Sequence, residues 1–280
     1  MPTPENSPPP RPTRSLKNKV AIVTGAGAKG TDIGNGRAAS ILLAEAGCCV
    51  VCVDMVLKLA EQTVSMILAE GVGRAIAVAA DVTDDAACAR VVERAMGEFG
   101  RVDILVNNVG IMGAGGTVED VDLEAWDRGI EVNVKSMVLM ARHAIPAMLA
   151  STGIGSNGGF YRGSIVNMGS VAGLRGGTPS VLYPTTKGAV VQLTRAMAYQ
   201  HASQGIRVNC VCPGMLYTPM MYGEGMTAEM REARRNRSLL KTEGNGWDAG
   251  AAVRFLAGDE ARYVVFVFKG IFILILGEDG

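Results

Sequence analysis

Short, nearly continuous apolar runs alternate along the chain with longer segments in which apolar residues recur at helical spacing. The short runs are typical of strands that helices cover on both faces, and the longer segments are typical of amphipathic helices. This alternation predicts a doubly wound α/β fold, in which helices cover both faces of a mostly parallel sheet. The predicted strands are Lys19–Thr24, Cys49–Asp54, Arg74–Ala80, Ile104–Asn107, Ser164–Met168, Ile206–Cys212 and a seventh near Ile271–Leu276. The predicted helices are about Gly36–Ala46, Leu57–Glu70, Asp84–Phe99, Leu123–Leu149, Leu182–His201 and Asp248–Leu256.

A single domain is predicted to occupy most of the chain. Residues 1–15, "MPTPENSPPPRPTRS", are rich in proline and polar residues and lack the apolar stretch of a secretory signal, so we expect a disordered tail. Residues 16–280 are expected to form one domain with a lid segment at about 215–245. The apolar run "YVVFVFKGIFILILG" is interrupted by Lys269 and Gly270 and is too short to span a membrane, which favours a buried strand. We therefore expect a cytoplasmic protein without a membrane partner.

Charge and cysteine usage exclude several function classes. The chain has 27 basic and 27 acidic residues, so it lacks the basic excess that binding to a nucleic acid backbone requires. The six cysteines lie in apolar or helical segments, which favours reduced core thiols. Cys49 and Cys52 match a redox or zinc spacing, but residues three apart on a strand point to opposite faces. His143 and His201 lie on predicted helices without a partner at ligand spacing, and no metal site is expected.

A glycine-rich stretch, "TGAGAKGTDIGNGRA", connects the first predicted strand to the first predicted helix. A loop at this place in an open α/β sheet can hold a pyrophosphate, because glycines allow close backbone approach and the helix N-terminus offers unpaired N–H groups. The next strand ends in Asp54, whose carboxylate is placed to accept hydrogen bonds from an adenosine ribose. The two features together predict a dinucleotide site.

Further short motifs occur in a fixed order along the chain. They are "TGAG…GNGRA", "ADV" at Asp81 and Val82, "NNVG" from Asn107 to Gly110, "VNV" around Asn133, "SIVNMGSVAG" around Ser170, "YPTTK" from Tyr183 to Lys187, and "RVNCVCPG" followed by "TPM" from Thr218 to Met220. With these motifs the chain resembles the short-chain dehydrogenase/reductase family, of the Tyr-x-x-x-Lys type, from Lys19 to about Tyr263. The resemblance implies a Rossmann-like fold and an oxidoreductase.

The resemblance also implies roles for individual residues. Tyr183 would be the general acid/base toward the carbonyl or alcohol oxygen, and Ser170 would hydrogen-bond that oxygen. Lys187 would hold the nicotinamide ribose, and Asn133 would join it and a water in a proton relay. The implied cofactor contacts are Gly25, Gly34 and Gly36 at the diphosphate, Asp81 and Val82 at the adenine, Asn107 and Gly110 on the adenosine side, and Pro213, Gly214 and Thr218 at the nicotinamide.

The spacing of Tyr183 and Lys187 agrees with these implied roles. Residues four apart lie on one face of a helix, so the ammonium can sit below the phenol. We expect its charge to favour the ionised phenol and to bring the pKa of Tyr183 nearer neutrality.

Three departures from the family pattern stand out. Eight residues, Ala26–Ile33, occupy a place where the family has three, and we expect this insertion to bulge near the phosphates and to bring Lys29 toward them. A second glycine-rich insertion, Ser151–Gly159, is predicted to be a surface loop. The chain ends in "YVVFVFKGIFILILGEDG" instead of the family's usual closing motifs, which leaves the last strand and any subunit contact it supplies open.

The lid segment gives the information on substrate. It carries Met215, Leu216, Met220, Met221, Tyr222 and Met226, which favour an apolar or cyclic secondary alcohol or ketone, or else simply pack the lid on the protein. The basic stretch Met230–Arg237 leaves a 3-oxoacyl-carrier reductase open, although a solvated helix face is favoured. A catalytically silent dinucleotide-binding protein is the remaining alternative, because fold alone never assigns activity.

Asp54 predicts NAD in preference to NADP. Its carboxylate would repel a 2′-phosphate, unless Lys29 or Arg37 reaches that phosphate and offsets the repulsion. By similarity to the family, the helices Leu123–Leu149 and Leu182–His201 are expected to pair subunits into a homodimer or homotetramer.

Overall fold

The computed structural model of the chain describes residues 11–71, 73–151, 161–176, 178–223, 225–265 and 274–276. In these residues seven parallel strands form one sheet in the order β3-β2-β1-β4-β5-β6-β7. The strands are β1 Val20–Thr24, β2 Cys49–Asp54, β3 Arg74–Ala79, β4 Ile104–Asn107, β5 Gly163–Met168, β6 Ile206–Pro213 and β7 Leu274–Leu276. The doubly wound, parallel sheet predicted from the sequence is confirmed.

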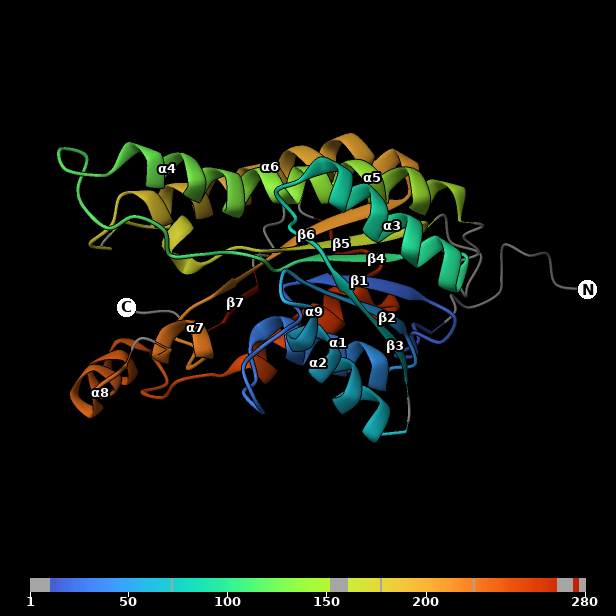
Figure 1. Ribbon diagram of the computed structural model, residues 1–280, viewed down its shortest axis with the longest axis horizontal. Helices are drawn as coiled ribbons and strands as arrows, with labels where there is room; N and C mark the ends of the chain where they lie inside the picture. The colour runs from blue at the N-terminus through green and yellow to red at the C-terminus, as the bar shows by residue number, and fades with distance from the viewer. Residues whose placement is uncertain are drawn as a thin grey trace, which may run out of the picture.

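Helices cover both faces of the sheet (Figure 1). One layer contains α1 Asn35–Glu45, α2 Leu57–Ala69 and α9 Gly246–Ala257. The other layer contains α3 Asp85–Phe99, α4 Leu123–Ile130, α5 Ser136–Ala150 and α6 Leu182–His201. The short helices α7 Pro219–Tyr222 and α8 Ala228–Arg237 lie at the left-hand end of the molecule in Figure 1.

Alternate residues of each strand enter two separate cores, as the pleat of a strand requires. On β1, Ile22 belongs to the core beneath α3, α5 and α6, and its neighbours Ala21 and Val23 belong to the core beneath α1 and α9. All three side chains are 0% exposed. Burial of both faces explains why the strands read as continuous apolar runs in the sequence.

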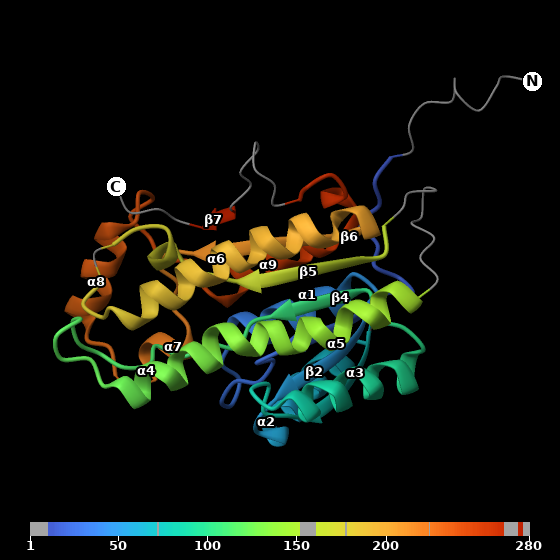
Figure 2. The same ribbon diagram turned by 90° about the horizontal axis from the view of Figure 1, so that it is seen from above.

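The order of the strands reverses between β1 and β4. β2 and β3 lie to one side of β1, whereas β4, β5, β6 and β7 lie to the other side. Figure 2, the view from above, shows α3, α5 and α6 over one face of the sheet. In a doubly wound sheet the loops that leave the carboxyl ends of the two central strands diverge and leave a crevice. The fold therefore places a binding site at the carboxyl ends of β1 and β4.

The predicted helix Leu123–Leu149 differs from the observed structure. Helical backbone does run from Leu123 to Ala150, but a π-helical turn, Glu131–Lys135, separates α4 from α5. A π-turn displaces the apolar pattern by only one position, and apolar residues recur at helical spacing on both sides of it, so periodicity indicates one continuous helix. The short helix α7 was also not predicted, because it lies in a segment without a clear period.

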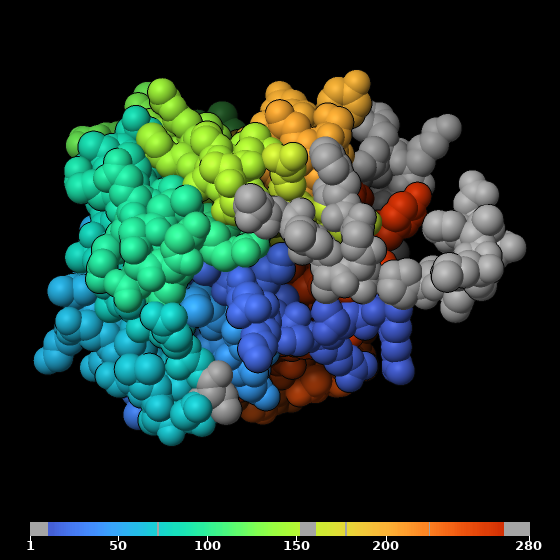
Figure 3. All heavy atoms as spheres, turned by 90° about the vertical axis from the view of Figure 1, so that its right-hand side faces the viewer, coloured from blue at the N-terminus to red at the C-terminus, as the bar shows by residue number. Residues whose placement is uncertain are grey.

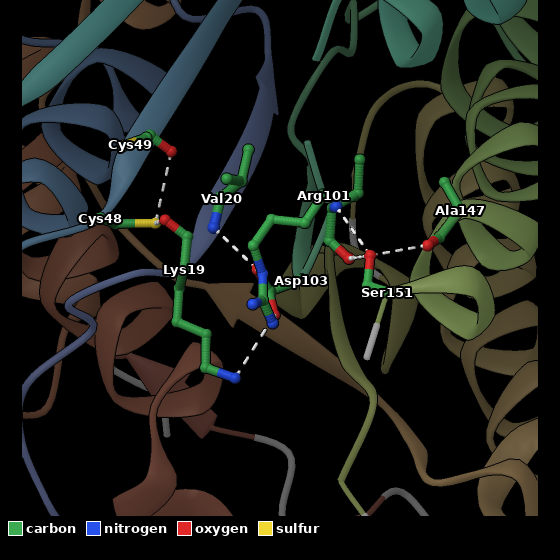
Figure 4. A network of polar contacts seen from close by, with 9 residues as sticks. Lys19, Val20, Cys48, Cys49, Arg101, Asp103, Ala147 and Ser151 are labelled. Carbon is green, nitrogen blue, oxygen red and sulfur yellow. Dashed lines mark hydrogen bonds and ion pairs between the residues drawn. The ribbon is translucent and has the colours of Figure 1, made fainter. Parts of the chain in front are cut away.

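At the amino ends of the strands, a buried carboxylate joins β1 to β4. Asp103, 3% exposed, accepts hydrogen bonds from the backbone N–H of Val20 at 2.9 Å and from Arg101 Nη2 at 2.7 Å (Figure 4). Lys19 Nζ lies 3.3 Å from the same carboxylate. Because Asp103 immediately precedes β4, this network joins the amino ends of β1 and β4, far from the crevice.

The first described residues of the chain contact the segment that follows α9. The backbone N–H of Thr13 donates to Asp259 Oδ2 at 2.9 Å, and Arg14 Nε lies 3.1 Å from Glu260 Oε1. Figure 3 shows this end of the molecule, where the blue N-terminal segment lies beside the red part of the chain near the C-terminus. Residues 1–10 of the predicted tail, most of the second glycine-rich insertion and most of the C-terminal run lie outside the described residues. In the described part of the chain, every helix is too short or too polar to cross a membrane.

Candidate active site

Two adjoining cavities, of about 360 Å³ and about 350 Å³, lie at the carboxyl ends of the strands. The larger cavity, called the catalytic cavity here, is lined by Ser170, Tyr183 and Lys187. The smaller one, called the adenosine cavity here, is lined by Asp54 and by the predicted adenine contacts. Both are lined by Gly25, Gly27, Asn108, Gly110 and Met220, so they form one continuous cleft. The cleft occupies the crevice that the strand order predicts.

The glycines of the first loop give the cleft its floor. Gly25 has φ +63°, and a Cβ on Gly36 would lie 2.0 Å from the carbonyl oxygen of Gly25. Gly34 is the N-cap of α1, and because it has no side chain the N-terminal N–H groups of the helix have no side-chain cap. The first turn of α1, all of it described, also has no acidic residue. Bare N–H groups with a positive helix dipole suit a diphosphate, so this loop fits a dinucleotide.

The inserted residues Ala26–Ile33 are held by a buried arginine. The Arg37 side chain is 0% exposed, and its guanidinium donates to the carbonyl oxygens of Ala28 at 2.6 Å, Gly30 at 2.7 Å and Asp32 at 2.7 Å. Its Nε donates to Thr63 Oγ1 at 3.0 Å, and burial lowers the pKa of the guanidinium. Arg37 therefore fixes the path of the inserted loop through its carbonyl groups. Lys29 is exposed and lines neither cavity of the described structure, so the expectation that it turns toward the phosphates is not supported.

The adenosine cavity is lined by Asp54 and Asp81, the two acidic residues that the sequence analysis assigned to the cofactor. Asp54, at the end of β2, accepts hydrogen bonds from the backbone N–H groups of Gly27 and Val56, each at 3.0 Å. Asp81 and Val82 follow β3 and also line this cavity. Hydrogen bonds from Thr83 lower the pKa of Asp81. The cavity thus presents fixed carboxylates to whatever enters it.

The catalytic cavity is built from the ends of β5 and the start of α6. Ser170 caps a short 3-10 turn by accepting the backbone N–H of Ala172 at 3.1 Å, and its hydroxyl also hydrogen-bonds that of Tyr183. Lys187, one helical turn beyond Tyr183, donates to the carbonyl oxygen of Met168 at 2.8 Å. The ammonium lies 5.7 Å from the centroid of the Tyr183 ring. The three side chains therefore converge on one place: the spacing places Tyr183 beside Lys187, and Ser170 joins them as the family resemblance implies.

Burial dominates the acid–base properties of this group. Desolvation raises the pKa of Tyr183, and the hydrogen bond from Ser170 opposes that rise. Desolvation also lowers the pKa of Lys187 to about 8. The pKa of Tyr183 in the protein alone therefore shifts in the opposite direction to the one expected from the lysine charge, and the loss of water around the phenol is the largest cause.

Asn133 stands behind the cavity, in the π-helical turn. Its amide Nδ2 donates to the carbonyl oxygen of Ile111 at 2.9 Å and to Thr186 Oγ1 at 3.0 Å, and its Oδ1 accepts the N–H of Ile111 at 2.8 Å. A Cβ on Gly110 would meet both Lys187 Nζ, at 3.2 Å, and Asn133 Oδ1, at 3.4 Å. The lysine and the asparagine thus face the same small space beside Gly110, although Asn133 does not line the cavity of the described structure.

Asn107, a predicted cofactor contact, does not line either cavity of the described structure. Asn107 is 2% exposed and its Nδ2 donates to Asn167 Oδ1 at 2.9 Å, between β4 and β5. Its neighbour Asn108 lines both cavities and donates to the carbonyl oxygens of Thr24 and Gly25, at 3.1 Å and 3.0 Å. Adjacent residues at the end of a strand face opposite sides, so a pair of asparagines gives no sign of which one meets the cleft.

The expected nicotinamide contacts Pro213, Gly214 and Thr218 all line the catalytic cavity. Beyond them, Met215, Leu216, Met220 and Met221 line it as expected, whereas Tyr222 and Met226 do not in the described structure. The ends of the 215–245 segment are paired with each other, because the N–H of Tyr217 donates to the carbonyl oxygen of Gly244 at 2.8 Å and the N–H of Gly244 to that of Met215 at 3.1 Å. Arg234 and Arg237, from the basic stretch Met230–Arg237, also line this cavity, as does Arg175, which the sequence analysis did not single out.

The cysteines and histidines contribute no metal centre in the described part of the chain. Cys49, Cys52 and the other four cysteines are free thiols. His143 Nε2 lies 2.8 Å from Asp85 Oδ1, and His201 Nδ1 lies 2.8 Å from Gln204 Oε1. Both histidines are thus ordinary helix residues with one polar partner each.

Comparisons with known proteins identify relatives of this fold and site. A family model described as enoyl-(acyl carrier protein) reductase matches residues 29–266. The cis-4-hydroxycyclohexanecarboxylate dehydrogenase of Sinomonas cyclohexanicum is 36% identical over 251 residues, which cover 90% of this chain and 94% of that protein. The meso-2,3-butanediol dehydrogenase of Serratia marcescens is 34% identical, with 88% of this chain and 90% of that protein covered.

A solved structure shares the whole architecture. It is a 7α-hydroxysteroid dehydrogenase complexed with NADH and 7-oxoglycochenodeoxycholic acid, and it matches with a TM-score of 0.83 and 28% identity over 95% of this chain and 97% of that chain. The family model spans Ser170, Tyr183 and Lys187, and the matches to the two relatives cover 90% and 88% of this chain. The chain belongs to the short-chain dehydrogenase/reductase family and is an oxidoreductase that acts on CH–OH or C=O groups.

Proposed function

We propose that this protein interconverts a secondary alcohol and a ketone, with NAD(H) as the hydride carrier and Tyr183 as the general acid/base. The observation that carries this proposal is the convergence of Ser170, Tyr183 and Lys187 on a cavity that continues into the glycine-rich loop. Relatives whose names specify a hydroxycyclohexane acid and a butanediol support a secondary alcohol. The methionines of the catalytic cavity suit an apolar or cyclic body.

Ser170 and Tyr183 have different roles in the proton transfer. Ser170 holds the substrate oxygen, and Tyr183 gives that oxygen a proton when the ketone is reduced or removes one when the alcohol is oxidised. The raised pKa keeps the Tyr183 phenol protonated in the protein alone, which suits the acid role. A bound nicotinamide supplies or accepts the hydride.

Lys187 and Asn133 support the acid/base role of Tyr183. Lys187, held on the Met168 carbonyl, keeps an ammonium next to the phenol and lies where a nicotinamide ribose would be bound. Asn133 Oδ1 faces the same space beside Gly110 as the lysine does, which supports a proton relay from the phenol through lysine and water toward the asparagine. Because Asn133 lies in a π-turn, its position depends on that local distortion.

NAD is the preferred dinucleotide in this proposal. Asp54 lines the adenosine cavity, where its carboxylate would accept ribose hydroxyls and repel a 2′-phosphate. Arg37 donates all its described hydrogen bonds to carbonyls of the inserted loop and to Thr63, and it is fully buried, so it does not offset that repulsion from the cavity side.

The test is turnover of a panel of alcohols and ketones, including a 3-oxoacyl thioester, followed by the absorbance of the reduced nicotinamide. We expect turnover of at least one secondary alcohol, and we expect Tyr183→Phe to lower it by about 10² to 10⁴ while dinucleotide affinity changes little. Tyr199→Phe is the matched control, because Tyr199 lies on the same helix, is 83% exposed and should leave turnover unchanged.

Three outcomes contradict parts of the proposal. Retention of more than about a tenth of turnover in Tyr183→Phe removes the assigned role. Turnover of the thioester alone assigns a 3-oxoacyl-carrier reductase. Dinucleotide binding without turnover of any compound assigns the catalytically silent class.

A further inference from the structure

The inserted loop, Ala26–Ile33, and the lid segment both line the cleft. Gly27 of the loop and Met220 of the lid line the catalytic cavity and the adenosine cavity alike, so loop and lid flank the place where the two cavities join. The glycine-rich floor beside the loop is the part of the cleft that suits a diphosphate. A dinucleotide in this cleft would therefore contact the loop and the lid at the same time.

A hydrogen bond joins the inserted loop to the lid beside the cleft. The phenol of Tyr222, the last residue of α7, donates to the carboxylate of Asp32 in the loop. Loss of water and the negative charge of Asp32 raise the pKa of Tyr222, so the phenol keeps the proton that it donates. Neither residue lines a cavity of the described structure. This contact, called the loop–lid bond here, therefore lies outside the space that a ligand would fill.

The loop side of this bond is fixed by backbone contacts. The carbonyl oxygen of Asp32 accepts a hydrogen bond from Arg37 Nη1 at 2.7 Å, and the N–H of Asp32 donates to the carbonyl oxygen of Lys29 at 3.0 Å. Arg37 is 0% exposed and holds two further carbonyl groups of the same loop. The backbone of Asp32 thus has a defined position, from which the carboxylate reaches α7.

The lid side of the bond is held by aromatic and ionic contacts. The ring of Tyr222 lies against that of Tyr217, with the ring centroids 4.7 Å apart. Arg231 covers the Tyr217 ring, with its guanidinium carbon 3.7 Å from the ring centroid, and Arg231 Nε donates to Glu243 Oε2 at 2.7 Å. The side chain of Glu243 is 3% exposed. A continuous set of contacts therefore leads from a buried carboxylate near the end of the lid to the loop–lid bond.

One helical turn connects the loop–lid bond to the lining of the catalytic cavity. The N–H of Tyr222 donates to the carbonyl oxygen of Thr218 at 3.2 Å, and the N–H of Met221 donates to the same oxygen at 2.8 Å. Thr218, Met220 and Met221 all line the catalytic cavity, and Thr218 is an expected nicotinamide contact. The position of Tyr222 therefore bears on the part of the lid that faces a bound dinucleotide.

The ends of the lid are held more firmly than α7. Backbone hydrogen bonds pair Tyr217 with Gly244, and a Cβ on Gly246 would lie 2.6 Å from the carbonyl oxygen of Ile33. These contacts cannot open without a loss of backbone hydrogen bonds and close packing. Tyr222 and Asp32 are only partly buried, so water can replace each partner when their bond breaks. The loop–lid bond can therefore open while the ends of the lid stay in place.

We propose that the loop–lid bond between Asp32 and Tyr222 holds α7 closed over a bound dinucleotide, and that the bond opens when the dinucleotide leaves. Asp32 and Tyr222 are positioning residues, because they act through the loop and through the turn from Thr218 to Tyr222. This inference rests on the proposed function, since it requires a dinucleotide in the cleft, and it adds a control of how long the dinucleotide stays bound. The acceptor belongs to the insertion that departs from the family pattern.

The experiment measures how fast NADH dissociates from the full-length protein, by stopped-flow fluorescence with excess NAD to displace it. Tyr222→Phe removes the hydroxyl and keeps the ring against Tyr217. We expect NADH to dissociate about fivefold to tenfold faster from this variant, which is the effect of one net hydrogen bond. Asp32→Ala should also accelerate dissociation. In the double variant, Tyr222→Phe should add nothing to the effect of Asp32→Ala, because each change removes the same bond.

Lys29→Ala is the matched control. Lys29 lies in the same loop, is exposed and lines neither cavity of the described structure. This variant should leave the NADH dissociation rate within about twofold of the wild type, as expected for a surface substitution. The Tm of each variant is recorded, and we expect Tyr222→Phe to release NADH faster without a lower Tm.

Several outcomes would overturn the inference and leave the proposed function standing. These are an unchanged NADH dissociation rate in Tyr222→Phe, an equal acceleration by Tyr222→Phe with and without the Asp32 carboxylate, and an equal acceleration in Lys29→Ala. Faster release that occurs only together with a lower Tm would also overturn it, because a general loosening of the fold would then be the cause. A wild type that does not bind NADH would refute the proposed function itself.

Discussion

Arg37 offers a direct test of how the inserted loop is held. The variant Arg37→Met keeps the length and the apolar stem of the side chain, and removes its charge and its donors. Four hydrogen bonds are lost, to the carbonyl oxygens of Ala28, Gly30 and Asp32 and to the hydroxyl of Thr63. The expected results are a less stable protein and a weaker dinucleotide site, because the same loop provides the floor of the cleft.

The size of the effect follows from these contacts. Hydrogen bonds from a charged donor contribute about 1.5 kcal/mol each at the lower limit, so four contribute about 6 kcal/mol. Two terms reduce this sum. Water can reach carbonyl groups of the exposed part of the loop, and the buried guanidinium itself carries a desolvation cost, which is the cause of its lowered pKa. We expect a net loss of about 3 kcal/mol, half of the gross sum.

For a chain of this length such a loss lowers Tm by about 6 °C. Calorimetry gives this shift, and titration calorimetry should give an NAD Kd at least tenfold higher. Arg90→Met is the matched control, because Arg90 lies on a helix surface with a side chain that is 65% exposed and 3.8 Å from Asp84, and its loss should cost less than about 0.5 kcal/mol. A Tm for Arg37→Met within about 1 °C of the wild type would refute the account of the loop.

The other predictions concern the lysine, the cofactor and the assembly. Burial lowers the pKa of Lys187 from 10.5 to about 8, so the folded protein holds fewer protons than the unfolded chain between these values, and wild-type stability should rise there by about 3 kcal/mol relative to Lys187→Met. Urea unfolding from pH 7.5 to 10 measures this, and a constant difference between the two proteins would contradict it. The wild type should bind NAD at least tenfold more tightly than NADP, with the ratio reduced in Asp54→Ala, and tighter NADP binding by the wild type would remove the role of Asp54. Light scattering at micromolar concentration should give a dimer or tetramer, and a monomer alone would exclude the proposed pairing through α5 and α6.

The sequence predicted the elements best where burial dictated the pattern. The strands Cys49–Asp54 and Ile104–Asn107 and the helix Leu182–His201 agree with the structure at both ends. Each is buried on at least one face, so its apolar residues report its period directly. The helical spacing of Tyr183 and Lys187 likewise placed them on one face, whereas Ser170 was placed beside them through the family resemblance.

What could not be predicted depends on the paths of loops. The cage of carbonyls around Arg37 exists because the inserted loop folds back over α1, and no periodicity describes that path. Arg175 and Arg237 lie far apart in the sequence and meet at one cavity only through the course of the lid. The raised pKa of Tyr183 depends on how completely water is excluded, which residue spacing does not report.

The π-turn between α4 and α5 limits how this segment can evolve. It accommodates one more residue than an α-helical turn, which shifts the angular positions of all following side chains by about 100°. Deleting a single residue from Glu131–Lys135 would restore a regular helix with α4 and α5 in their present phase, and would remove the local distortion that places Asn133 beside Gly110. Point substitutions in this stretch keep the turn, whereas a change of length removes it. We therefore expect natural variants of this enzyme to differ here in residue identity and to keep the number of residues constant.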